Sequence, residues 1–156
     1  MESKRLQLLQ GMPIFGALKE STLDYLCEQS VVVAVAAGES FFREGDAAQS
    51  LFVLEEGTAI VEKASQDGQR ILHRFGPGDC FGEMALVDMN PRSASVVAET
   101  SCLALEVHNM SLFGLYERDL EQFTMIQMNL MREVSRRLRH LDQQLAEMQA
   151  QIDLVR

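Results

Sequence analysis

Seven short β-prone runs separated by turns fill the middle of this 156-residue chain and restrict its fold more than any other feature. The runs lie at residues 31–36, 40–43, 51–54, 58–61, 71–75, 95–98 and 103–107. Turn-forming residues stand between several of them, in Glu55-Glu56-Gly57, Asp67-Gly68 and Thr100-Ser101. Many short strands joined by close turns indicate a sandwich, a jelly roll or a small barrel.

Short helical patterns precede this β-rich zone. Leu6, Leu8 and Leu9 come before a break at residues 11–13, and a second helix is expected to begin near Ser21, whose hydroxyl can cap it. The chain is long enough for one domain with a real core and too short for two ordinary domains. We therefore expect an N-terminal helical segment at 1–30, a β-rich body at 31–115 and a C-terminal helix at 116–156.

Apolar residues in the C-terminal part recur at alternating spacings of three and four. They are Met131, Val134, Leu138, Leu141, Leu145, Met148, Ile152 and Val155. This 3.5-residue period is typical of a coiled coil, with the first residue at heptad position a. Arg137 then falls at g and Asp142 at the next e, so the two can meet across a parallel pair of helices. The pattern predicts a parallel homodimer through this helix; the alternative is a helix folded back on its own chain.

Charge and cysteine content exclude several classes of protein. The formal net charge of −9 disfavours general binding of nucleic acid or of anionic membranes, because both need a basic face. No leader or membrane-length apolar run is apparent, and the expectation is a cytoplasmic protein. Three scattered cysteines and three distant histidines have no metal-ligand spacing, so no metal and no disulfide are predicted.

One stretch, FGEMALVDMNPRSASV at residues 81–96, combines a glycine, a carboxylate and an arginine within binding reach of one another. Gly82 allows close approach of the backbone, and Arg92 offers a planar fork of donors that matches two phosphate oxygens. Glu83 would be repelled by a phosphate unless it faced a hydroxyl donor such as a ribose 2′-OH. Phosphate and sugar together suggest a nucleotide.

The same stretch closely resembles the phosphate-binding cassette of the cyclic-nucleotide-binding domain family, which includes the catabolite activator protein and the regulatory subunit of cAMP-dependent protein kinase. Further similarity lies in MPIFGAL, in FFREGDAAQSLFVLEEGTAIV, in GPGDCFGE and in the long C-terminal helix. The resemblance implies a mainly β fold: an eight-stranded β-roll of the jelly-roll type, with flanking helices and a long C-terminal α-helix.

The resemblance also implies roles for individual residues. The predicted ligand-binding set is Phe81, Gly82, Glu83, Met84, Ala85, Arg92, Ser93, Arg137, Leu141 and Asp142. Within it, the backbone amides of Gly82 and Ala85, the guanidinium of Arg92 and Ser93 would hold the cyclic phosphate. Glu83 would bind the ribose 2′-OH and pair with Arg137.

Two residues bear on the choice between cAMP and cGMP, and they favour different nucleotides. A serine or alanine after the cassette arginine is usual in cAMP binders of the family, and Ser93 fits that group. Asp142 lies about where the C-terminal helix would meet the base, and its carboxylate could accept two hydrogen bonds from guanine. A salt bridge from Arg137 would occupy that carboxylate, so cAMP is favoured and cGMP is the alternative.

Other functions were weighed against a sensor. No nucleophile, base and orienting group fall into a catalytic arrangement, so an enzyme is not expected. Three scattered cysteines cannot build a four-thiolate iron–sulfur cluster in one chain. Cys80 could ligate a haem, but Glu83 and Arg92 would then have no purpose, so haem is disfavoured. A dimerisation module without ligand stays open, as does the N-terminal part of a transcription regulator that lacks its helix-turn-helix. The sequence does not distinguish a stand-alone sensor from a fragment of a longer protein.

Overall fold

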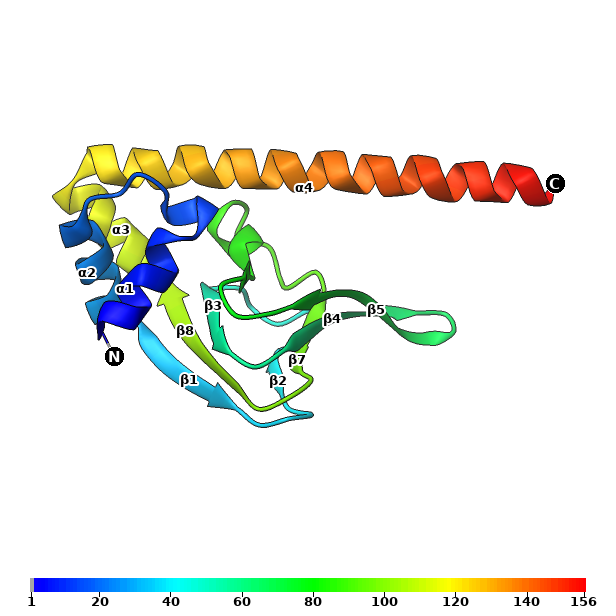
Figure 1. Cartoon of the computed structure of the whole chain (residues 1–156), viewed down its shortest axis with the longest axis horizontal. Helices are drawn as coiled ribbons and strands as arrows, with labels where there is room; N and C mark the ends of the chain where they lie inside the picture. Colours follow the sequence, from blue (N-terminus) through cyan, green and yellow to red (C-terminus); the bar gives the residue numbers. More distant parts are fainter. Residues whose placement is uncertain (1) are drawn as a thin grey trace.

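A computed structural model of the chain describes residues 2–156 and shows an antiparallel β-roll flanked by helices (Figure 1). The first sheet contains β1 (Val31–Val35), β8 (Cys102–His108), β3 (Ser50–Glu56) and β6 (Cys80–Phe81), in that order. The second contains β2 (Ser40–Phe42), β7 (Ser95–Ala98), β4 (Ala59–Ser65) and β5 (Gly68–Phe75). The eight-stranded roll that the resemblance implies is confirmed.

Helices cover one end of the roll. The N-terminal ones are α1 (Glu2–Gln10), the 3-10 turn η1 (Pro13–Phe15) and α2 (Glu20–Gln29); α3 (Asn109–Arg118) follows the last strand, and α4 (Leu120–Val155) ends the chain. Their apolar side chains meet the first sheet in one buried cluster, which includes Leu26, Leu51 and Ile126. A second cluster, with Phe52, Phe75 and Phe81, fills the space between the two sheets.

The start of α2 differs from the expected capping. The helix begins at Glu20, so Ser21 lies inside its first turn, and no side chain of the capping residue Lys19 bonds to it. Gln122 of α4 supplies the missing partner: its Oε1 accepts hydrogen bonds from the Lys19 backbone N–H at 2.9 Å and from the Thr22 hydroxyl at 3.0 Å. A partner a hundred residues away replaces the local cap, which the local pattern could not indicate.

The long helix α4 has two different halves. Its first half packs on the molecule through buried residues such as Ile126 and Leu130, while every residue from Leu138 to Arg156 is exposed. Figure 1 shows this second half extending beyond the roll, with the β4–β5 hairpin projecting beneath it. Leu138, Leu145 and Ile152 of the heptad pattern are 59%, 63% and 47% exposed in the single chain. The apolar seam of α4 is therefore uncovered in the single chain and accessible to a second helix.

No helix among the described residues is long and apolar enough to cross a membrane. The described residues also contain no group of three or more His, Cys, Asp or Glu side chains that could hold a metal ion.

Candidate functional site

The segment after β6 forms a tight turn at Gly82 and then the short 3-10 helix η2 (Glu83–Leu86). Gly82 has φ 80° and ψ 10°, the left-handed conformation that glycine adopts without strain. A Cβ atom here would lie 2.6 Å from Nη1 of Arg92 and 3.3 Å from the Ser50 carbonyl oxygen. Both the turn and the close approach of Arg92 therefore require glycine at this position.

Arg92 reaches this turn from the loop before β7, and its side chain is almost fully buried. Nη2 donates to the Ser50 carbonyl at 2.8 Å, and Nη1 donates to the Gly82 carbonyl at 3.2 Å. The guanidinium lies over the ring of Phe42, with Cζ 4.0 Å from the ring centroid. Nε is buried and has no hydrogen-bond partner within residues 2–156. One donor of a buried cation is thus left for a group that the chain does not supply.

Burial also shapes the electrostatics of this cation. Desolvation lowers the pKa of the Arg92 guanidinium, and the nearby charges of Glu106 and Asp46 act in the opposite direction. The group remains charged at neutral pH because arginine starts from a very high value. A buried positive charge with a free donor favours an anion as its partner.

A pocket of about 290 Å³ opens in front of this cation. Its lining includes seven of the predicted residues: Phe81, Gly82, Glu83, Met84, Arg92, Ser93 and Arg137. Apolar side chains of the roll, among them Val61 and Phe75, form the opposite wall. The pocket combines apolar walls with a few convergent charged groups, as sites for small ligands commonly do.

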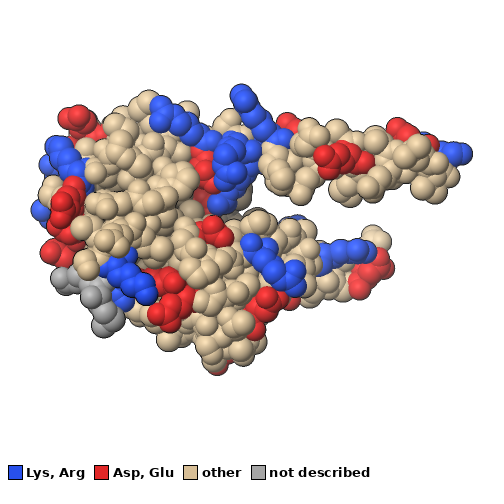
Figure 2. Space-filling model, in the orientation of Figure 1, with Lys and Arg blue, Asp and Glu red and all other residues tan. Residues whose placement is uncertain are grey.

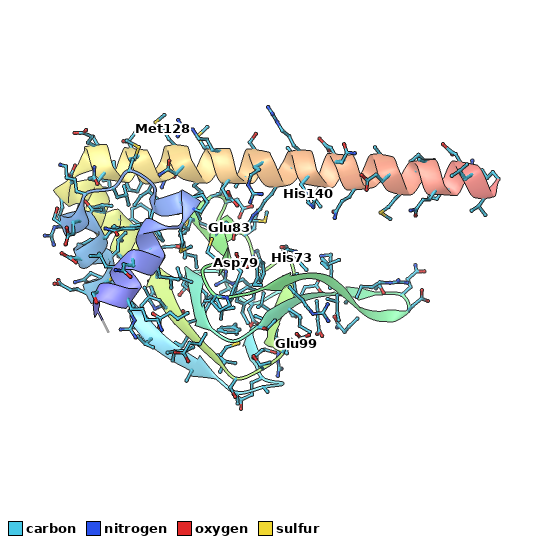
Figure 3. All side chains as sticks on the ribbon, viewed as in Figure 1. His73, Asp79, Glu83, Glu99, Met128 and His140 are labelled. Carbon is cyan, nitrogen blue, oxygen red and sulfur yellow. The ribbon has the colours of Figure 1, made fainter. Side chains whose placement is uncertain are left out.

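Glu83 closes the pocket toward α4 through an ion pair with Arg137. The carboxylate is nearly buried, with 5% of its side chain exposed, and Arg137 is one-third exposed. Nε of Arg137 also lies 3.4 Å from Oε1 of Glu133, one helical turn earlier on α4. Figure 3 shows Glu83 beneath α4 at the point where the helix leaves the roll, and Figure 2 shows basic and acidic side chains gathered there.

Comparison with known proteins places this arrangement in a family. The family model described as "Cyclic nucleotide-binding domain" matches residues 32–119, more than half of the chain. The chain belongs to the cyclic nucleotide-binding domain family.

Relatives of this cyclic nucleotide-binding domain include the cAMP-dependent protein kinase type II regulatory subunit of Drosophila melanogaster, 33% identical over 107 residues that cover 69% of this chain. The Cyclic AMP receptor protein of Thermus thermophilus is 30% identical over 142 residues, or 88% of this chain. The regulatory domain of Toxoplasma gondii PKA, crystallised with cAMP, has a TM-score of 0.69 at 26% identity and covers 72% of this chain and 43% of its own. The chain spans 28% of the first protein and 62% of the second.

Three predicted residues of the cyclic nucleotide-binding domain stand apart from the other seven. Leu141 lines a second, neighbouring pocket of about 460 Å³ between α4 and the roll, where Arg137 also contributes. Asp142 is exposed on α4 and lines neither pocket. Ala85 lies in η2, and its side chain is outside the described part of the structure.

The expected pair of Arg137 with Asp142 requires a second copy of the chain and stays a prediction. Within one chain, Arg137 is held by Glu83 and Glu133 instead. The pair of Glu83 with Arg137 that the resemblance implies is present in the single chain, because α4 passes directly over the cassette at this turn.

Sequence reasoning missed three residues of this cyclic nucleotide-binding domain that contact the Arg92 or Arg137 side chain. The ring of Phe42 lies under the Arg92 guanidinium, and the Ser50 carbonyl accepts a hydrogen bond from that guanidinium. Glu133 is buried on α4 beside Arg137. A signal for Phe42 existed in the Phe41-Phe42 run, but the run does not indicate which of the two rings lines the pocket, and the β2–β7 register is irregular here. The heptad pattern places Glu133 on the outside of the seam, and nothing in that pattern shows that the roll covers it.

Proposed function

We propose that this chain is a cAMP-binding regulatory domain in which the cassette at residues 81–93 holds the nucleotide and α4 transmits its presence. The observation that carries the proposal is the buried Arg92 guanidinium, which lines a pocket and whose buried Nε–H has no partner among the described residues. The two relatives named above carry cAMP in their names, and the Toxoplasma structure contains it, which supports a cyclic nucleotide as the missing anion.

In the proposed complex, the cyclic phosphate lies against Arg92, Ser93 and the backbone amides of Gly82 and Ala85. Arginine suits this role because its planar fork can bind two phosphate oxygens at once. Glu83 accepts a hydrogen bond from the ribose 2′-OH, and Arg137 already orients its buried carboxylate. Phe81 and Met84 line the apolar part of the pocket. The site acts by binding alone, and no catalytic step is proposed.

The signal is proposed to leave the site through Glu83 and Arg137, because this ion pair joins the cassette to α4. A ligand hydroxyl that donates to Glu83 weakens the ion pair between that carboxylate and Arg137. Glu133, on α4 with Arg137, is an alternative partner for the guanidinium. In this proposal residues 31–115 sense the ligand, and residues 116–156 form a parallel homodimer whose geometry responds. Such coupling needs a contact that differs between the free and bound states, and Arg137 supplies one.

Replacing Arg137 by alanine is expected to change both cAMP affinity and the response of the dimer. The variant leaves the buried Glu83 carboxylate without its partner, and we expect the affinity to change by about fivefold or more, a typical coupling magnitude. Titration with cAMP and small-angle X-ray scattering with and without cAMP measure the two effects. Arg139→Ala on the exposed face of the same helix is the control. Wild-type affinity together with an unchanged scattering response in Arg137→Ala would contradict this route.

A second candidate ligand, cGMP, is favoured by one observation. Asp142 has no ion-pair partner in the described structure of a single chain, and Arg137 is engaged by Glu83 and Glu133. The Asp142 carboxylate lines neither pocket but is not committed to an arginine, so a guanine that extended to this part of α4 would offer it the N1–H and N2–H₂ donors. Ser93 and the names of the relatives favour adenine.

Competition titrations with cAMP and cGMP on the wild type and on Asp142→Ala separate the two ligands. We expect wild type to prefer cAMP and Asp142→Ala to keep that preference. Asp153→Ala, further along the same exposed helix, controls for the loss of one negative charge. Tighter binding of cGMP by the wild type, reversed in Asp142→Ala but not in Asp153→Ala, would show that Asp142 reads guanine and that the choice of cAMP is wrong.

A further inference from the structure

The back of the Arg92 guanidinium, away from the pocket, meets a chain of hydrogen bonds that ends at a carboxylate. Nη2 of Arg92 lies 2.8 Å from the Ser50 carbonyl oxygen and 3.5 Å from the Ser50 hydroxyl. That hydroxyl donates to Oε1 of Glu106 at 2.8 Å. Ser50 is almost fully buried, and the Glu106 side chain is 22% exposed. Arg92, Ser50 and Glu106 therefore form a continuous series of contacts from the pocket to a carboxylate on β8.

The strand register explains how these residues come together. Along the β3–β8 ladder, Ser50 is opposite His108 and Phe52 is opposite Glu106. Ser50 and Glu106 are thus diagonal neighbours on one face of the sheet, within reach of each other's side chains. His108 Nε2 also lies 3.8 Å from Oε1 of Glu106. The rigid centre of the first sheet holds the carboxylate at a fixed place behind Arg92.

A hydroxyl group alone would not fix the orientation of Arg92. The Ser50 hydroxyl can rotate, and it presents lone pairs toward Nη2 only when its own hydrogen points elsewhere. Donation to the Glu106 carboxylate sets that direction and is a charge-assisted hydrogen bond, which is stronger than a neutral one. The Glu106 charge also opposes the desolvation that lowers the pKa of the Arg92 guanidinium. Phe42 restrains the face of the same group at 4.0 Å.

We propose that Glu106 is a positioning residue for ligand binding, which acts through the Ser50 hydroxyl to hold the plane of the Arg92 guanidinium so that Nε and the free N–H groups face the pocket. The proposal rests on the proposed function, because it assumes that Arg92 binds the ligand phosphate. Glu106 itself touches no ligand in this arrangement. Its value lies in preorganisation, since a donor fork already held in place loses less entropy when it binds.

The sign of the effect of Glu106→Ala tests this role. Removing a negative charge near an anion site would by itself strengthen binding of cAMP, whereas loss of the hydrogen-bonded support weakens it. We expect Glu106→Ala and Ser50→Ala each to weaken cAMP binding by about tenfold, and the double variant to be no weaker than either single one. Glu106→Gln keeps an acceptor for the Ser50 hydroxyl and is expected to stay within about threefold of the wild type.

A ligand-free measurement separates this proposal from the proposed function. Rotation of the Arg92 guanidinium about its Nε–Cζ bond, followed by nitrogen-15 exchange NMR, should be slow in the wild type and faster in Glu106→Ala and Ser50→Ala. Glu99→Ala, which removes a carboxylate paired with Arg74 on the surface, should leave rotation and cAMP affinity unchanged. If the wild type failed to bind cAMP but the guanidinium still rotated slowly in the wild type and faster in the two variants, only the proposed function would be contradicted. Tighter binding by Glu106→Ala, additive effects of the two single variants, or unaltered rotation would overturn the positioning role.

Discussion

Arg92→Ala is expected to weaken cAMP binding by at least about 2 kcal/mol, which is more than tenfold, while the roll stays folded. The loss follows from removing a charge-assisted, two-pronged contact to the phosphate. Stability is expected to hold because Arg92 is a buried cation with an unpartnered Nε, and its removal relieves a desolvation cost. Calorimetric titration with cAMP measures the affinity, and thermal unfolding followed by circular dichroism measures the fold.

The matched control is Arg74→Ala, which removes an arginine that pairs with Glu99 on the surface of the roll. It should bind cAMP as the wild type does. If a folded Arg92→Ala protein bound cAMP as tightly as the wild type, the proposal that the cassette binds the phosphate through Arg92 would be wrong. A collapsed thermal transition in Arg92→Ala would instead show that the guanidinium holds Gly82 and Ser50 together as a structural bridge.

The combined variant Leu138→Asp with Leu145→Asp is expected to convert the protein into a folded monomer. Both leucines occupy heptad position a and are more than half exposed in the single chain, so the roll does not depend on them. In a parallel pair of helices, the four new carboxylates would meet at the centre of the seam. Light scattering should give 17.5 kDa for the variant and twice that mass for the wild type.

Gln143→Asp with Ala150→Asp is the control for this seam, because it adds the same charges at outer f positions of the same helix. It should keep the mass of a dimer. If the seam variant also kept that mass, the coiled coil would have no part in association. If the wild type were already a monomer, the heptad pattern would need another partner.

The β-rich body was predictable because its strands and turns are local signals. Alternating apolar residues and turn glycines locate seven strands, and the missed strand β6 consists only of Cys80 and Phe81, too short to show a period. The ends of β3, β4 and β5 extend beyond the predicted runs, since the ladder continues into polar residues such as Lys63 and Arg70. Neighbouring strands, which local sequence does not reveal, set those ends.

The core of the candidate site was predictable because Gly82, Glu83, Arg92 and Ser93 lie close together in the chain. The support around them comes from distant segments and was not predictable. Ser50 and Glu106 meet through the β3–β8 register, and Glu133 becomes buried only because α4 crosses the cassette. The Ser21 cap was wrong for a similar reason, since Gln122 from α4 takes its place.

Titration of the wild-type chain with cAMP in a calorimeter tests the central claim most directly. The account predicts a saturable heat signal with one nucleotide bound per chain, competed by cGMP only at higher concentration. A folded wild-type protein that gives no saturable signal with either nucleotide would contradict it, and would leave the buried Arg92 as a structural cation in a pocket that binds no cyclic nucleotide.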